Sequence, residues 1–82
     1  MSKWYVTMND SFMSYWGKAE GKINKLVFEC DSFQEASKLE DYARGRDEMK
    51  YINITRNKPK YSNNRYYVQY LTKNDYPNWY GL

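Results

Sequence analysis

The side chains of this sequence that could carry chemistry are dominated by ten tyrosines and three tryptophans, whereas cysteine occurs once and histidine is absent. Histidine is the usual proton carrier in catalysis near neutral pH, because its unperturbed pKa lies close to that pH. The single thiol, Cys30, has no histidine to act as its base, and we expect it to fill space in the core. Tyrosine and tryptophan combine a large apolar surface with a polar tip and are enriched in interfaces. This inventory predicts a binding protein that is not an enzyme.

Metal and cofactor sites find no support in the same inventory. A zinc site needs several cysteine or histidine ligands, and the acidic residues do not have the spacing of a calcium-binding loop. The glycines match neither a dinucleotide fingerprint nor a phosphate-binding loop. The neighbouring carboxylates Glu40 and Asp41, and likewise Asp47 and Glu48, are expected to be solvated charges. We therefore predict no metal, no cofactor and no catalytic residue.

A chain of 82 residues is expected to form a single domain over residues 1–82. One cysteine cannot form an internal disulfide, which favours a reducing compartment. The start of the sequence lacks the apolar stretch of a signal peptide, and no apolar run approaches the roughly 20 residues that span a bilayer. These features predict a cytoplasmic protein that makes no contact with a membrane.

The clearest helix signal is the segment SFQEASKLEDYARGR, which begins at Ser32. Ser32 and Glu35 have the spacing of a capping box, in which each side chain binds a free amide of the first turn. Apolar residues recur at helical spacing from Phe33 to Ala43 and predict one buried stripe. Gly45 is expected to end the helix in a left-handed conformation.

Four other segments alternate apolar and polar residues as half-buried strands do, namely KWYVTM (3–8), KLVFEC (25–30), MKYINITR (49–56) and RYYVQYL (65–71). The order predicts an α+β fold of two layers, β-β-α-β-β, with one helix packed on one face of a four-stranded sheet. A short helix over residues 11–16, in the long first connection, is left open. The aromatic residues expected in the core are Trp4, Phe28, Phe33, Tyr66 and Tyr70.

Positive charge is concentrated toward the C-terminal end of the sequence. The net charge is +3, and residues 51–82 hold five basic residues and one acidic residue. Four of these basic residues lie in RNKPKYSNNR (56–65), whose proline and asparagines predict an exposed basic hairpin loop between two strands. A basic surface can attract an anionic partner, although it also keeps a small protein in solution.

The sheet face opposite the helix is expected to carry Tyr5, Val27, Tyr51 and Tyr67, because a single helix covers only one face. One interpretation is that aromatic residues of the first connection fold over this face as a second small core. Another is that its tyrosines contact a protein, either a different partner or a second copy in a homodimer. A third is that they stack the bases of a single-stranded nucleic acid while basic side chains bind phosphates.

The candidate partner-binding residues combine these sheet tyrosines with aromatic and basic residues of the loops and the tail. The small core would be formed by Phe12, Tyr15 and Trp16, and Lys58, Lys60 and Arg65 would bind phosphates. The full candidate set is Tyr5, Tyr15, Trp16, Tyr51, Arg56, Lys58, Lys60, Tyr61, Arg65, Tyr67 and Trp79.

The segments WYVTM, FMS-W-G-AEGK-NK and RYYV together form a pattern that extends over nearly the whole chain. In this pattern the sequence resembles small uncharacterised proteins of bacteriophages and other bacterial mobile elements. The resemblance implies no catalytic motif and assigns no residue a role. It implies a bacterial host, in which small proteins of this kind often act by binding and redirecting host machinery, including by inhibiting nuclease-based defence systems. The leading hypothesis is therefore a stoichiometric protein-interaction module, with a basic single-strand nucleic-acid-binding protein as the alternative.

Overall fold

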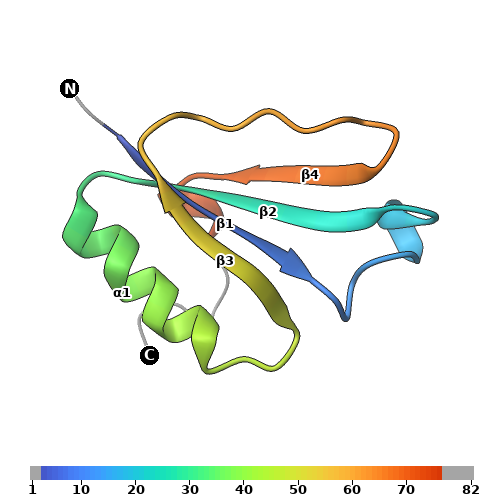
Figure 1. Ribbon diagram of the computed structural model, residues 1–82, viewed down its shortest axis with the longest axis horizontal. Helices are drawn as coiled ribbons and strands as arrows, with labels where there is room; N and C mark the ends of the chain where they lie inside the picture. Colours follow the sequence, from blue (N-terminus) through green and yellow to red (C-terminus); the bar gives the residue numbers. More distant parts are fainter. Residues whose placement is uncertain (1–2, 77–82) are drawn as a thin grey trace.

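The computed structural model describes residues 3–76 of the chain. Its elements are β1 (Trp4–Asp10), a 3₁₀ helix (Gly17–Ala19), β2 (Ile23–Cys30), α1 (Phe33–Arg44), β3 (Met49–Thr55), β4 (Tyr66–Leu71) and a second 3₁₀ helix (Lys73–Asp75). The predicted two-layer α+β fold is confirmed, with α1 packed against one face of the four strands (Figure 1). No helix within residues 3–76 has the length and apolarity needed to cross a membrane. Of the candidate residues, Trp79 lies outside the described part.

The start of α1 follows the predicted capping box. The Ser32 hydroxyl accepts a hydrogen bond from the Glu35 amide at 3.1 Å, and the Glu35 carboxylate accepts one from the Asp31 amide at 3.3 Å. The left-handed stop at Gly45 is wrong, because that residue has a φ of −78°. The chain continues in right-handed turns toward β3, with the Arg46 amide donating to the Ala43 carbonyl, so no reversal is needed there.

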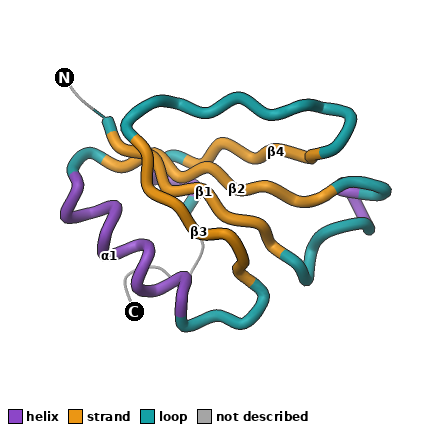
Figure 2. Tube along the Cα trace, viewed as in Figure 1, coloured by secondary structure: helices purple, strands orange, loops and turns teal. Residues whose placement is uncertain are grey.

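The sheet is mixed and has the strand order β3-β1-β2-β4. β1 pairs antiparallel with both β2 and β3, whereas β2 and β4 are parallel. β3 and β4 therefore run in the same direction at opposite edges, and parallel strands cannot be joined by a hairpin. The predicted hairpin over residues 56–65 is wrong, since this segment is a crossover that passes from one edge of the sheet to the other (Figure 2).

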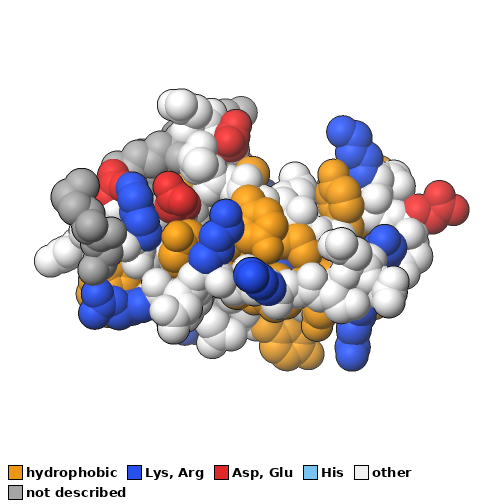
Figure 3. Space-filling view, turned by 90° about the horizontal axis from the view of Figure 1, so that it is seen from above, with side chains coloured by type: hydrophobic (Ala, Val, Ile, Leu, Met, Phe, Trp, Pro, Cys, Tyr) orange, Lys and Arg blue, Asp and Glu red, His pale blue; other side chains and the backbone are white. Residues whose placement is uncertain are grey.

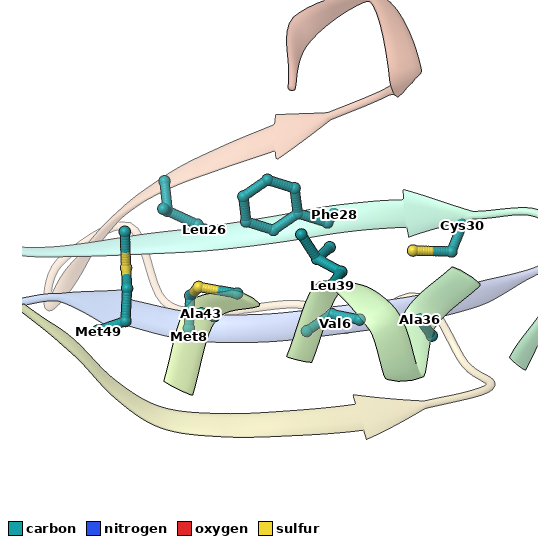
Figure 4. Close-up of a cluster of buried hydrophobic side chains, with 9 residues drawn as sticks. All are labelled: Val6, Met8, Leu26, Phe28, Cys30, Ala36, Leu39, Ala43 and Met49. Carbon is teal, nitrogen blue, oxygen red and sulfur yellow. The ribbon is translucent and has the colours of Figure 1, made fainter. Parts of the chain in front are cut away.

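The core lies between α1 and the sheet (Figure 4). Alternate residues of β1 and β2 face the helix, and Phe28 at the centre of the core is 0 % exposed. The Phe28 ring meets the Tyr76 ring edge to face with 5.4 Å between centroids. Phe33 does not belong to the buried stripe, because it is 50 % exposed at the first turn of α1 and contacts the Trp4 ring edge to face. The nine buried residues of this core cluster are Val6, Met8, Leu26, Phe28, Cys30, Ala36, Leu39, Ala43 and Met49.

The side chains of β4 face the opposite way from the prediction. Because Asn24 pairs with Tyr67 and Phe28 pairs with Leu71, the side chains of Tyr67 and Leu71 point to the helix side of the sheet. Tyr66 and Tyr70 consequently lie on the other face and not in the core, and Tyr67 does not share a face with Tyr5. Leu71 packs against the core and determines this register, because a shift by one residue would turn it away.

Candidate functional site

Exposed apolar side chains are concentrated in the connection between β1 and β2. Of the seven large apolar residues that are exposed among residues 3–76, four lie within residues 12–16. Phe12 is 69 % exposed and Trp16 is 49 % exposed, and Met13 is exposed beside them. We call Phe12, Met13 and Trp16 the loop cluster. The connection lies at the end of the sheet that α1 does not reach, on the right in Figure 1.

The backbone beneath the loop cluster is held by Asp10 and Ser14, both of which are buried. The Asp10 carboxylate accepts hydrogen bonds from the amides of Phe12 and Met13, each at 3.0 Å. The Ser14 hydroxyl donates a hydrogen bond to the backbone carbonyl of Asp10 and accepts one from the backbone N–H of Asn24. These bonds form a turn and not the short helix left open over residues 11–16, because side-chain oxygens take the amides that a helix would pair with carbonyls.

Asp10 supplies the first prediction. Asp10→Ala removes the acceptor of two amides, and we expect it to lower the free energy of unfolding by about 1 to 3 kcal/mol. Amide exchange at Phe12 and Met13 should accelerate in parallel. Asp10→Asn keeps one acceptor oxygen, so its free energy of unfolding should fall less than that of Asp10→Ala. Urea unfolding monitored by tryptophan fluorescence measures the difference, and equal stability of the alanine variant and the wild type would contradict this role.

The two aromatic rings of the loop cluster support each other. The Trp16 indole N–H donates to the Phe12 carbonyl at 2.6 Å, and the two rings meet edge to face with 6.0 Å between centroids. Each ring therefore has a fixed orientation while remaining exposed. An aromatic pair fixed in this way loses little conformational entropy when it enters a partner surface.

A hollow of about 210 Å³ lies beside the loop cluster on the helix side of the sheet. Met13, Trp16 and Tyr67 line it, and Lys18 adds a cation. Asn24 contributes to the lining and accepts a hydrogen bond from the Gln69 side chain at 2.8 Å. The structure thus brings together two predicted residues, Trp16 of the first connection and Tyr67 of β4.

The other face of the sheet is covered in part by the crossover over residues 56–65. Val27 is 1 % exposed there, and the Tyr61 ring meets the Tyr66 ring with 5.3 Å between centroids. Phe12 and Trp16 remain exposed, so the interpretation in which they cover this face is wrong. Their connection is held at the end of the sheet, and the crossover takes the covering role.

The basic residues of the crossover rest largely on the protein's own aromatic rings. The Lys58 ammonium lies 4.7 Å from the centre of the Tyr70 ring, and the Arg56 guanidinium lies 5.1 Å from the Trp4 ring. Arg65 lies 5.9 Å from the Tyr66 ring, whereas Lys60 is exposed. Figure 3, which looks down on the crossover, shows Lys and Arg side chains among hydrophobic ones. Three of the four basic residues of the crossover therefore contact aromatic rings that were expected in the core.

Lys25 is a buried cation beneath the crossover. Its ammonium lies 4.8 Å from the centre of the Tyr61 ring and 5.3 Å from that of the Tyr66 ring. Burial lowers the pKa of Lys25 from its ordinary value, because removal from water disfavours the charged form. Cation–π attraction to the two aromatic rings offsets part of the hydration energy that the ammonium loses on burial.

The lowered pKa of Lys25 predicts a pH dependence of stability. Folding penalises the charged form, so this penalty is fully present below the folded-state pKa and disappears as the pH rises toward the unfolded value of about 10.4. We expect Lys25→Met to be at least as stable as the wild type at neutral pH. As the pH rises, the free energy of unfolding of the wild type should increase relative to that of the variant. A stability difference independent of pH between 7 and about 10.4 would contradict this account.

The remaining predicted residues fall into separate places. Tyr5 lies with Lys58 and Tyr70 at a small hollow of about 50 Å³ on the face away from α1. Tyr15 and Tyr51 line a third hollow, near the end of β1. The predicted set is therefore dispersed over several small surfaces.

Sequence reasoning did not identify Phe12 and Met13 as binding candidates, nor Lys18 and Gln69 as lining residues. A usable signal was the separation of Phe12 and Trp16 by four residues, which lets the indole N–H reach the Phe12 carbonyl across one turn. The sequence alone did not indicate that this turn forms.

Within residues 3–76, no group of three His, Cys, Asp or Glu side chains is placed to hold a metal ion. Cys30 is fully buried, as expected of a space-filling residue, and its sulfur lies 3.4 Å from the Tyr76 hydroxyl. That hydroxyl also donates to the Glu29 carbonyl. Cys30 and Tyr76 thus attach the segment after β4 to the end of β2.

Comparison of the chain with protein-family models, with curated proteins and with solved structures gives no match.

Proposed function

We propose that the protein is a non-enzymatic binding module that docks one partner protein through the loop cluster and the adjoining hollow. The observation that carries this proposal is the exposure of Phe12, Met13 and Trp16 on a backbone fixed by Asp10 and Ser14. Ordering exposed apolar side chains without covering them gives no benefit to the isolated fold. It does reduce the entropy lost on association, and aromatic residues are the commonest anchors of interfaces.

The chemistry of the surface indicates what the partner must present. Met13, Trp16 and Tyr67 require an apolar projection that can enter the hollow, and Lys18 favours a carboxylate at its edge. The resemblance to proteins of bacteriophages and mobile elements favours a host protein, and inhibition of a nuclease-based defence system as the result of binding. Such inhibition would be stoichiometric, because it requires only that the partner's working surface be covered.

The alternative of a nucleic-acid-binding protein requires Tyr5, Tyr51 and Tyr67 to share one face. Tyr67 lies on the helix side, and Lys58 and Arg65 already contact tyrosine rings. This arrangement supports a protein partner more than an extended nucleic-acid path across the sheet.

The proposal is tested by capture from a bacterial host lysate, followed by titration of the purified partner. Wild-type protein should retain a partner at a ratio of one to one, and the variant M13S/W16S should not. Phe33→Ser removes an exposed aromatic ring at the start of α1 and serves as the matched control. Retention of the same partner by M13S/W16S would overturn the proposed surface.

Self-association is the competing outcome, since a homodimer could bury the same loop cluster. Sedimentation velocity of the wild type and M13S/W16S distinguishes the two. A monomeric wild type agrees with the proposal, whereas a dimer that dissociates in the variant would assign the surface to a second copy.

A further inference from the structure

The third hollow, near the end of β1, is separate from the surface of the proposed function. It has a volume of about 270 Å³ and is lined by residues of β1, β2, β3 and the first connection. Two exposed tyrosines, Tyr15 and Tyr51, contribute to its lining, and Asn9 and Lys50 add polar groups. We call it the tyrosine hollow. Its size suits one planar ring system better than an extended peptide.

Both tyrosines of this hollow have strained backbones. Tyr15 has a φ of 71° and Tyr51 a φ of 55°, and they are the two residues other than glycine with positive φ among residues 3–76. This conformation is costly for a bulky side chain, and such outliers concentrate at functional sites. Their occurrence at one hollow makes the tyrosine hollow the leading candidate for a second site.

A β-bulge explains how Tyr51 reaches the hollow. Thr7 pairs with Asn53 and Asn9 pairs with Lys50, so two residues of β3, Tyr51 and Ile52, lie opposite one residue of β1. Ile52 packs against the core, whereas Tyr51 is 76 % exposed. Bulges commonly redirect a side chain in this way beside a binding site.

The side-chain amide of Asn9 contains an oxygen that has no hydrogen-bond donor among residues 3–76. Its side-chain oxygen is buried and accepts no hydrogen bond within the described part of the chain. A buried acceptor without a donor is unfavourable in the free protein, so rotation of the Asn9 side chain toward a ligand that supplies an N–H group would relieve it.

The charge at the hollow is positive. Lys50 is the one charged residue among those that line it, and in the sheet Asn9 lies between Lys50 on β3 and Lys25 on β2. A ligand that suits the hollow therefore combines a planar ring, an N–H donor and a negative charge.

We propose that the tyrosine hollow binds one nucleotide unit, with the base against Tyr15 and Tyr51 and the phosphate near Lys50. A base supplies the ring and the N–H donor for Asn9, and its phosphate supplies the anion. An arginine side chain would place a second cation beside Lys50, and an acidic side chain lacks a ring and a donor. A tryptophan of a protein partner has the ring and the N–H but no anion, so it is the competing occupant.

Fluorescence-anisotropy titrations at low salt test the proposal with a labelled single-stranded oligonucleotide, an abasic strand of equal length and a tryptophan-containing peptide. Competition with free AMP distinguishes a mononucleotide from a strand as the source. We expect saturable binding of the base-bearing strand, stronger than that of the abasic strand. Tyr51→Gly should weaken it at least about fivefold, which is the lower range for loss of one stacking contact. Lys50→Gln should reduce the dependence on salt.

Two controls protect the interpretation. Tyr51→Gly relieves the positive φ, so it should melt no lower than the wild type, which separates loss of binding from loss of fold. Lys38→Gln removes an equal charge from α1 and should leave the binding unchanged. Equal binding of the abasic strand, no binding of either the strand or AMP, or Tyr51-dependent binding of the peptide alone would overturn the proposal. M13S/W16S tests the other surface, so the two proposals can fail separately.

Discussion

Replacement of Phe28 by alanine is expected to lower the free energy of unfolding by about 3 to 5 kcal/mol, the largest change in stability that one substitution should cause here. Phe28 is fully buried at the centre of the core and its ring meets that of Tyr76. A cavity at this position would remove contacts from both β2 and the segment after β4. In a domain of this size such a loss is a large fraction of the total stability.

Urea unfolding monitored by circular dichroism measures this change. Phe28→Leu keeps most of the buried volume and should lose clearly less than the alanine variant. A loss below about 1 kcal/mol for Phe28→Ala would show that this region is not the main core.

Replacement of Trp16 by alanine is expected to weaken binding of the partner protein by at least about 2 kcal/mol, or roughly 30-fold. The indole is half exposed in the free protein and lines the hollow with Met13 and Tyr67. Its loss removes an ordered aromatic anchor and releases the Phe12 carbonyl to solvent. The effect on stability should be much smaller, because little buried area is lost.

Calorimetric titration of the purified partner against the variant measures the binding change, and thermal melting measures the effect on the fold. Phe33→Ala is the matched control, since Phe33 is exposed to a similar degree and lies at the start of α1. Equal losses of affinity in the two variants would show that Trp16 has no special role.

The helix and the existence of four strands could be predicted because their signals are local. The pair Ser32 and Glu35 marks the start of α1, and the spacing of Ala36, Leu39 and Ala43 marks its buried side. These features depend on neighbouring residues alone. The ion pair between Glu40 and Arg44, at 3.0 Å, follows from the same helical spacing.

The arrangement of β4 could not be predicted, because alternation defines two sets of side chains and does not say which set is buried. Tyr66 and Tyr70 are as apolar as Tyr67, so composition does not decide between them. The decision comes from the parallel pairing with β2, which brings Leu71 to Phe28. The crossover over residues 56–65 could not be predicted for the same reason, because whether this segment is a hairpin or a crossover depends on the order of the strands in the sheet.

The candidate sites show the same division between local and long-range information. Tyr15 and Trp16 could be selected as exposed aromatics, but their separation onto two hollows depends on a turn held by Asp10 and Ser14. Alternation alone places Tyr51 on a face of β3, and it does not reveal the bulge that accompanies its positive φ. Bulges and side-chain turns change direction without a strong mark in the sequence.

Photo-crosslinking in bacterial host cells tests the central claim most directly. A photoreactive phenylalanine analogue placed at Met13 lies within the loop cluster, and the same analogue at Gln34 lies on the exposed surface of α1. The account predicts a single covalent adduct with a host protein from position 13, lost on addition of Trp16→Ser, and none from position 34. Equal adducts from both positions, or none from position 13 in cells where the partner is captured, would contradict it.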